Sequence, residues 1–127
     1  MDDVGRVINP LLVAGQVHGG VAQGIGQAIM ENTVYDPESG QMTSSSFMDY
    51  TMPRADDMPM IDLDTNEVPC LTNVLGVKGA GEAGALVAPP VLIAAITNAL
   101  QEFDVSHIDM PATSERIWQL MQKPKAA

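Results

Sequence analysis

The chain contains one cysteine, Cys70, and only two histidines, His18 and His107. A single thiol excludes an internal disulfide, a zinc site of several thiolates and an iron–sulfur cluster built from this chain alone. The histidines lie far apart in the sequence, without the spacing of a metal-binding pair, so we expect no metal held directly by protein side chains. Cys70 lies between Pro69 and Leu71, a setting typical of a small apolar filler.

Basic residues and long apolar runs are also scarce. Six lysines and arginines stand against sixteen aspartates and glutamates, a formal net charge of −10. Such a surface repels phosphate groups, so we expect neither nucleic acid nor a membrane as partner. No apolar run reaches the roughly 20 residues that span a bilayer. The start, Met1-Asp2-Asp3, is acidic where a signal peptide is basic, and we therefore expect a cytoplasmic protein.

Composition and patterning predict a mixed α+β fold in one domain over residues 1–127. Hydrophobic residues make up 46% of the chain, enough for one core. Helices are expected over residues 19–31, 90–101 and 113–122. The first carries Gly20, Gly24 and Ala28 every four residues, which leaves one face nearly bare and suited to close packing. Residues 33–46 resemble a hairpin turning at 36–40, and short strands are expected elsewhere.

Two glycine-rich elements carry the candidate chemistry. The first, Gly79-Ala80-Gly81-Glu82-Ala83-Gly84, spells the letters of a dinucleotide-binding fingerprint. Against that function, Pro89-Pro90 fall where its helix should already be established, and a carboxylate between the glycines would repel a pyrophosphate. No complete βαβ unit precedes the glycines. A dinucleotide site is therefore the weaker alternative for this element.

The second element runs from Gly15 to Gly26 and places an amide side chain, Gln16, before glycines that open a helix. Free backbone N–H groups at a helix start bind strong acceptors, and glycine lets a ligand approach them. From these residues alone, a glycine-smoothed helix that simply packs on a neighbour is the favoured interpretation.

Short motifs occur in one order along nearly the whole chain, and together they are more specific than any one alone. They are Asn9-Pro10, Gly15-Gln16, Gly19-Gly20, Gln23-Gly24, Asp49-Tyr50, Met52-Pro53-Arg54, Gly76-Val77-Lys78-Gly79, Gly81-Glu82-Ala83-Gly84 and Pro111-Ala112-Thr113. This ordered set resembles the C-terminal part of the molybdopterin-binding large subunit of the xanthine dehydrogenase family, which includes aldehyde oxidases and aerobic carbon monoxide dehydrogenases. The resemblance covers roughly residues 3–122.

The resemblance implies a role for several residues. Glu82 matches the family's general-base glutamate, whereas the residues alone favour a solvated loop carboxylate. Gln16 matches a glutamine that hydrogen-bonds the cofactor. The full set of cofactor-binding residues implied in this way is Gln16, Gly19, Gly20, Lys78, Gly79, Ala80 and Gly81.

The resemblance further implies a molybdenum–molybdopterin cofactor, in bacterial relatives often the cytosine dinucleotide form, and oxidation of a small-molecule substrate with water-derived oxygen. A [2Fe–2S] cluster and FAD are expected on partner domains or subunits. Family subunits are much longer, and their upstream parts supply the substrate pocket, so we expect this chain alone to be inactive. It would need that upstream part or self-association into a homo-oligomer to cover its apolar faces. The competing hypothesis is a non-catalytic assembly module.

Overall fold

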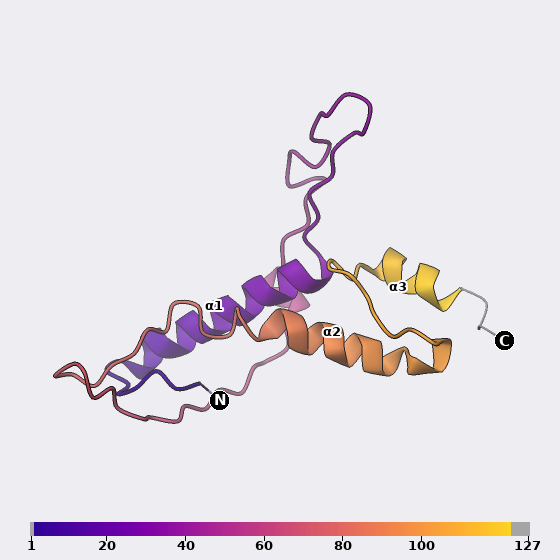
Figure 1. The fold of residues 1–127 in the computed structure, drawn as a ribbon. Coiled ribbons are helices and arrows are strands. Elements are labelled where there is room, and N and C mark those ends of the chain that lie inside the picture. The colour runs from indigo at the N-terminus through magenta and orange to yellow at the C-terminus, as the bar shows by residue number, and fades with distance from the viewer. Residues whose placement is uncertain (1, 123–127) are drawn as a thin grey trace.

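The computed structural model describes residues 2–122 and contains, within them, three α-helices. They are α1 (Pro10–Ile29), α2 (Ala88–Ala99) and α3 (Ser114–Met121), and the short 3₁₀ turns η1 (Ala55–Asp57) and η2 (Gln101–Phe103) lie between them. In Figure 1, α2 runs beside α1, α3 stands apart, and the chain after α1 projects as an arm. The mixed α+β class and the three predicted helices are confirmed, with little strand.

Helix α1 begins earlier than the sequence pattern predicted. The expected start near Gly19 was wrong by nine residues, because the helix begins at Pro10. Asn9 caps it in an extended conformation, with its side chain accepting a hydrogen bond from the backbone N–H of Leu12 at 3.2 Å. Proline suits the first helical position, where its missing N–H would have had no partner. Asn9-Pro10 is therefore a local start signal, and the later glycines lie inside the helix.

The bare face of α1 is packed as the glycine spacing predicted, and at Gly24 its neighbour is the start of α2. Gly20, Gly24 and Ala28 are buried. A Cβ atom added at Gly24 would lie 2.7 Å from the Cβ of Ala88 and 2.9 Å from Cδ of Pro89. The first turn of α2 can approach α1 this closely only because Gly24 has no side chain.

The expected strands appear, within residues 2–122, as isolated bridges. The predicted hairpin at 33–46 is a single antiparallel bridge between Tyr35 and Met42, closed by a turn in which Gly40 has φ +71°. It forms the distal part of the arm, which we define as residues 32–50 (Figure 1). At its base, the Tyr50 hydroxyl donates a hydrogen bond to the carboxylate of Glu31, two residues beyond the end of α1.

The N-terminal segment lies between two later parts of the chain. Asp2 forms a parallel bridge with Thr65, and Gly5 an antiparallel bridge with Val77. On the second side, the N–H of Lys78 donates to the carbonyl of Val4 at 2.9 Å. This pairing leads directly into the glycine-rich element at 79–84.

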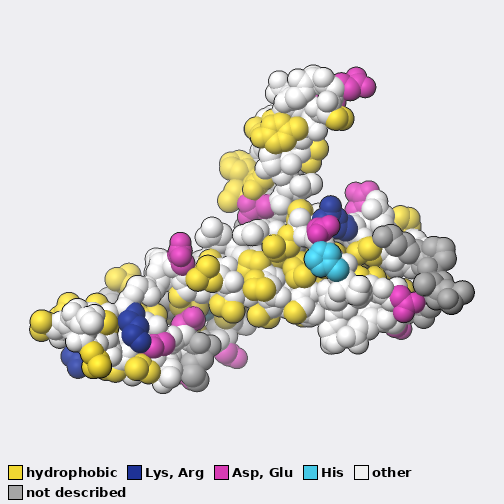
Figure 2. All heavy atoms as spheres, in the orientation of Figure 1, with side chains coloured by type: hydrophobic (Ala, Val, Ile, Leu, Met, Phe, Trp, Pro, Cys, Tyr) yellow, Lys and Arg dark blue, Asp and Glu magenta, His cyan; other side chains and the backbone are white. Residues whose placement is uncertain are grey.

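The chain buries few side chains for its size. Its accessible surface is 9165 Å², whereas a compact protein of this mass exposes about 6,500 Å². Many large apolar side chains are exposed, and Figure 2 shows them on the arm and at the end of the molecule that carries the start of α1. No described helix is both long and apolar enough to cross a bilayer. The buried hydrophobic residues are Val4, Val17, Ala28, Leu100, Val105, Ile108 and Ala112.

Candidate functional site

The glycine loop, residues 79–84, lies directly against the middle of α1. A Cβ atom added at Gly20 would lie 2.2 Å from the carbonyl oxygen of Ala83. From the other side, Gly84 has φ +85°, and a Cβ there would lie 2.8 Å from Cγ2 of Val21 and 2.9 Å from the carbonyl oxygen of Val17. Two glycines, one on each element, therefore bring the loop backbone onto the helix backbone.

Successive turns hold the loop in shape and place Glu82 between them. The N–H of Ala83 donates to the carbonyl of Ala80 at 3.2 Å, and the N–H of Ala85 donates to the carbonyl of Glu82 at 3.1 Å. The N–H of Ala88 then donates to the carbonyl of Gly84 at 3.0 Å and begins α2. The loop is thus anchored by α1 beneath it and by α2 after it.

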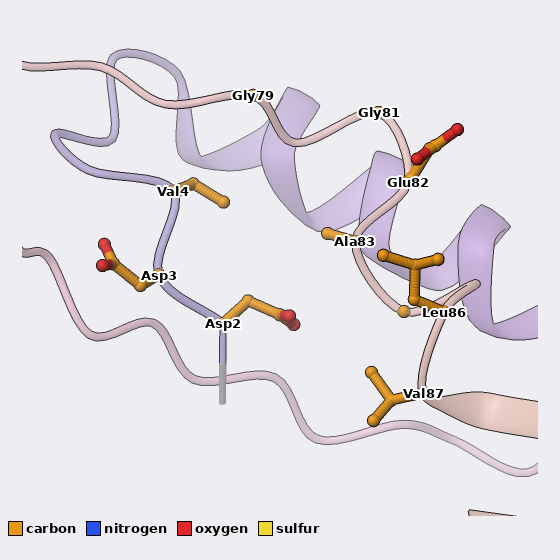
Figure 3. A pocket seen from close by; sticks show the side chains of 10 residues that line it. Asp2, Asp3, Val4, Gly79, Gly81, Glu82, Ala83, Leu86 and Val87 are labelled. Carbon is orange, nitrogen blue, oxygen red and sulfur yellow. The ribbon is translucent and has the colours of Figure 1, made fainter. Parts of the chain in front are cut away.

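The side chain of Glu82 is exposed. Figure 3 shows its carboxylate projecting away from the N-terminal segment, whereas the side chains of Val4 and Asp2 extend into the space between that segment and the loop. This space is a cavity of about 410 Å³. Its lining residues are Asp2, Asp3, Val4, Gly79, Gly81, Glu82, Ala83, Gly84, Leu86 and Val87.

The first half of the glycine loop presents free backbone donors. Within residues 2–122, no backbone atom accepts a hydrogen bond from the N–H groups of Gly79, Ala80, Gly81 or Glu82. Cβ atoms added at Gly79 and Gly81 would meet nothing within 4 Å. Consecutive, accessible N–H groups of this kind can bind the oxygen or nitrogen acceptors of a ligand.

Of the predicted cofactor-binding residues, Gly20 makes the contact with the loop, and Gly79, Ala80 and Gly81 lie in the loop itself. Gln16, Gly19 and Gly20 follow one another at i, i+3 and i+4 and therefore lie on one side of α1, where the loop rests on Gly20. Gln16 is exposed, and a Cβ at Gly19 would meet nothing within 4 Å. Gly20, in contrast, is buried beneath Ala83.

Lys78 differs from the other predicted residues because its ammonium group has a partner. It forms an ion pair with Asp3, and both side chains are about one-third exposed. The hydrogen bond from Lys78, helped by the N–H of Gly5, lowers the pKa of the Asp3 carboxyl. Lys78 therefore ties the N-terminal segment to the entrance of the glycine loop.

The geometry does not support the dinucleotide alternative. That fingerprint needs a helix directly after the glycines, and here turns continue through Val87 before α2 begins at Ala88. Sequence reasoning also missed two residues of the site, Val17 and Val21, on which Gly84 rests. Only their spacing to Gln16 and Gly20 along the helix could have indicated them.

Comparisons with known proteins agree on one family. The family model described as "Molybdopterin cofactor-binding domain" matches residues 1–59. The large subunit of nicotine 6-hydroxylase from Paenarthrobacter nicotinovorans is 38% identical over 117 residues, which are 92% of this chain and 14% of that protein. The carbon monoxide dehydrogenase large chain of Hydrogenophaga pseudoflava is 32% identical over 127 residues, all of this chain and 16% of that one.

Among solved structures, quinoline 2-oxidoreductase from Pseudomonas putida 86 superposes with a TM-score of 0.89 at 39% identity. The match covers 95% of this chain and 15% of that chain. The chain thus spans about one-seventh of the length of the proteins it matches.

Proposed function

The chain belongs to the family of molybdopterin-binding large subunits of molybdenum hydroxylases, and from this membership we propose that it contributes one wall and the general base of a molybdenum–molybdopterin site. Residues 1–127 would form a single segment from the C-terminal part of the cofactor-binding domain. The observation that carries the proposal is the contact between α1 and the glycine loop, in which Gly20 and Gly84 bring the two backbones together directly beside Glu82.

The residues present fit a large cofactor rich in hydrogen-bond acceptors. The N–H groups of Gly79, Ala80 and Gly81 donate to no backbone atom among the described residues, and Cβ atoms added at Gly79 and Gly81 would meet nothing within 4 Å. The exposed amide of Gln16 can both donate and accept from the facing helix, and Gly19 leaves the helix surface beside it open. Lys78, at the loop entrance, adds a positive charge that Asp3 holds in place. Gly20 supports the loop from beneath.

Bound there, the cofactor would supply a two-electron oxidation in which water provides the oxygen atom. The cytosine dinucleotide form, and a [2Fe–2S] cluster and FAD on partner domains or subunits as electron acceptors, belong to the same proposal.

Glu82 is the residue we assign as general base. It is the only titratable side chain among residues 79–85, so no neighbour in the loop competes for the proton. Its carboxylate is exposed and accepts no hydrogen bond within residues 2–122. The proton leaving the reacting oxygen would pass to this carboxylate, a transfer that typically contributes about 10²- to 10⁴-fold to a rate.

The exposed apolar surface supports the proposal that more protein completes the unit. Exposed apolar side chains lie near the start of α1 and in the loop of residues 71–75. We call them the apolar end: Ile8, Leu11, Leu12, Leu71, Val74 and Leu75. Leu71 is 98% and Leu11 81% exposed. Exposed apolar area of this extent is typical of an interface. We propose that the rest of a large subunit covers it, on the same chain or a separate one, and also shapes the pocket for a small-molecule substrate.

The small core favours a second candidate, a non-catalytic module that folds with its partner and binds no molybdenum by itself. Self-association would cover the same apolar end. Metal analysis and size determination of the purified 127-residue chain separate these candidates. Stoichiometric molybdenum would exclude the purely structural module, whereas a metal-free monomer would leave the cofactor site dependent on the partner.

The direct test of the leading proposal replaces Glu82 in the complete enzyme. Glu82→Gln keeps the size of the side chain but removes its basicity, and we expect turnover to fall by about 10²- to 10⁴-fold with molybdenum content unchanged. Glu38→Gln, an exposed carboxylate at the tip of the arm, is the matched control and should retain turnover. Normal turnover in Glu82→Gln would refute the assignment of the base.

A further inference from the structure

The contact between Gly20 and Ala83 joins two backbones next to the proposed base. The Ala83 carbonyl oxygen lies 2.2 Å, and the Ala85 nitrogen 3.0 Å, from where a Cβ of Gly20 would stand. Ala83 directly follows Glu82. The position of Glu82 relative to α1 therefore depends on how close α1 allows Ala83 to come.

A side chain at residue 20 would move the loop and not the helix. Unstrained contacts between non-bonded heavy atoms are about 3.5 Å, so the two backbones would have to separate by roughly 1 Å. Helix α1 around Gly20 is braced by its internal hydrogen bonds on both sides. The glycine loop has the turn bonds of Ala83 and Ala85, at 3.2 and 3.1 Å, and the bond from the N–H of Ala88 to Gly84 at 3.0 Å, while four of its N–H groups donate to no backbone atom among the described residues. The loop is the weaker partner and would yield.

We propose that Gly20 is a positioning residue, which sets the placement of the Glu82 backbone over α1 without touching substrate. This inference rests on the proposed function, because it gives Gly20 its importance through Glu82. Gly24, one turn later, differs in kind: a Cβ there would meet the side chains of Ala88 and Pro89, so it positions the start of α2.

The chain itself provides a matched pair of variants on one helix. Gly20→Ala places a methyl group against Ala83, whereas Gly15→Ala places the same methyl where nothing lies within 4 Å. In nuclear magnetic resonance spectra of the labelled 127-residue chain, we expect Gly20→Ala to shift the Ala83 and Ala85 amide resonances and to speed their hydrogen exchange. Gly15→Ala should leave both amides as in the unaltered chain. Identical loop spectra for the two variants would overturn the proposal.

A second variant keeps the test decisive if Gly20→Ala does not fold. Val21→Ala removes the methyl group on which Gly84 rests and introduces no new atom. If the contact with α1 holds the loop in shape, the amide hydrogens of Ala83 and Ala85 should exchange with solvent faster in this variant. Unchanged exchange rates would show that the loop holds its shape without α1.

The complete enzyme then tests whether placement matters for turnover. A 1 Å misplacement of a reacting group can lower a rate by about 100-fold, so Gly20→Ala should lower kcat to that extent with KM and molybdenum content unchanged. Combined with Glu82→Gln, it should cause no additional loss, because both changes act through one carboxylate. A further full loss in the double variant would refute the positioning role. Normal turnover in Glu82→Gln alone would instead refute the proposed function. The loop spectra would still show whether Gly20 sets the placement of the loop at Ala83.

Discussion

The pairing of the N-terminal segment with residues 76–78 depends on Gly5, and Gly5→Ala should break it. Gly5 has φ +67°, and a Cβ there would lie 2.4 Å from the carbonyl oxygen of Gly76 and 3.0 Å from the nitrogen of Lys78. Two hydrogen bonds flank this point, from the N–H of Arg6 to Gly76 and from the N–H of Lys78 to Val4, each 2.9 Å. Because all the crowding atoms are backbone, no rotamer change can relieve the clash.

The cost of this substitution has two separable parts. A left-handed backbone costs alanine about 1–2 kcal/mol more than glycine. Separation of the two segments would also lose the two flanking hydrogen bonds, at about 0.5–1.5 kcal/mol each. We therefore expect Gly5→Ala to lower the free energy of unfolding by about 2–5 kcal/mol. Gly40→Ala, at φ +71° with nothing within 4 Å, should show only the first part, about 1–2 kcal/mol.

Urea unfolding followed by far-ultraviolet circular dichroism measures both variants on the 127-residue chain. The midpoint shift at an unchanged slope gives the change in the free energy of unfolding. Equal destabilisation of Gly5→Ala and Gly40→Ala would refute the reasoning, since it would mean that close approach to Gly76 contributes nothing beyond the backbone conformation.

Three further predictions concern local interactions. The hydrogen bond to Glu31 raises the pKa of Tyr50 above its ordinary value of 10.0, so Glu31→Gln should return it toward 10.0 in a spectrophotometric titration. Because the folded-state pKa is raised, this bond should stabilise the chain fully below pH 10 and lose its effect as the pH rises through the raised value, so an unchanged alkaline unfolding profile in Glu31→Gln would contradict it. The hydrogen bond with Thr72, first among its causes, lowers the pKa of the half-buried Cys70 thiol; Thr72→Val should therefore slow its alkylation by iodoacetamide at pH 7.5. Gly15→Ala, in an open part of α1, should raise the free energy of unfolding by up to about 1 kcal/mol in urea titrations, and a loss of stability would show a contact at that position.

The helices show how far local signals reach. α2 begins at Ala88, two residues before its predicted start at residue 90, and α3 begins after Thr113, whose side chain caps it. Both starts depend on residues within one turn, and such information is local in the sequence. The start of α1 carried an equally local signal, Asn9-Pro10, but the glycines that follow were given more weight than the cap.

The sequence by itself determined that one face of α1 must be bare and that a glycine loop carrying Glu82 follows later in the chain, because composition and spacing are local properties. Only the tertiary structure decided what fills that face. The carbonyl of Ala83 lies against it at Gly20 and the first turn of α2 at Gly24, so the two glycine-rich elements are in direct contact. It also decided that residues 2–5 lie between 65 and 77 as single bridges and not as strands of a sheet. Such contacts join residues about 60 to 70 positions apart. The spacing of small residues along a helix shows that one of its faces will be covered, but it does not show which later segment of the chain covers that face.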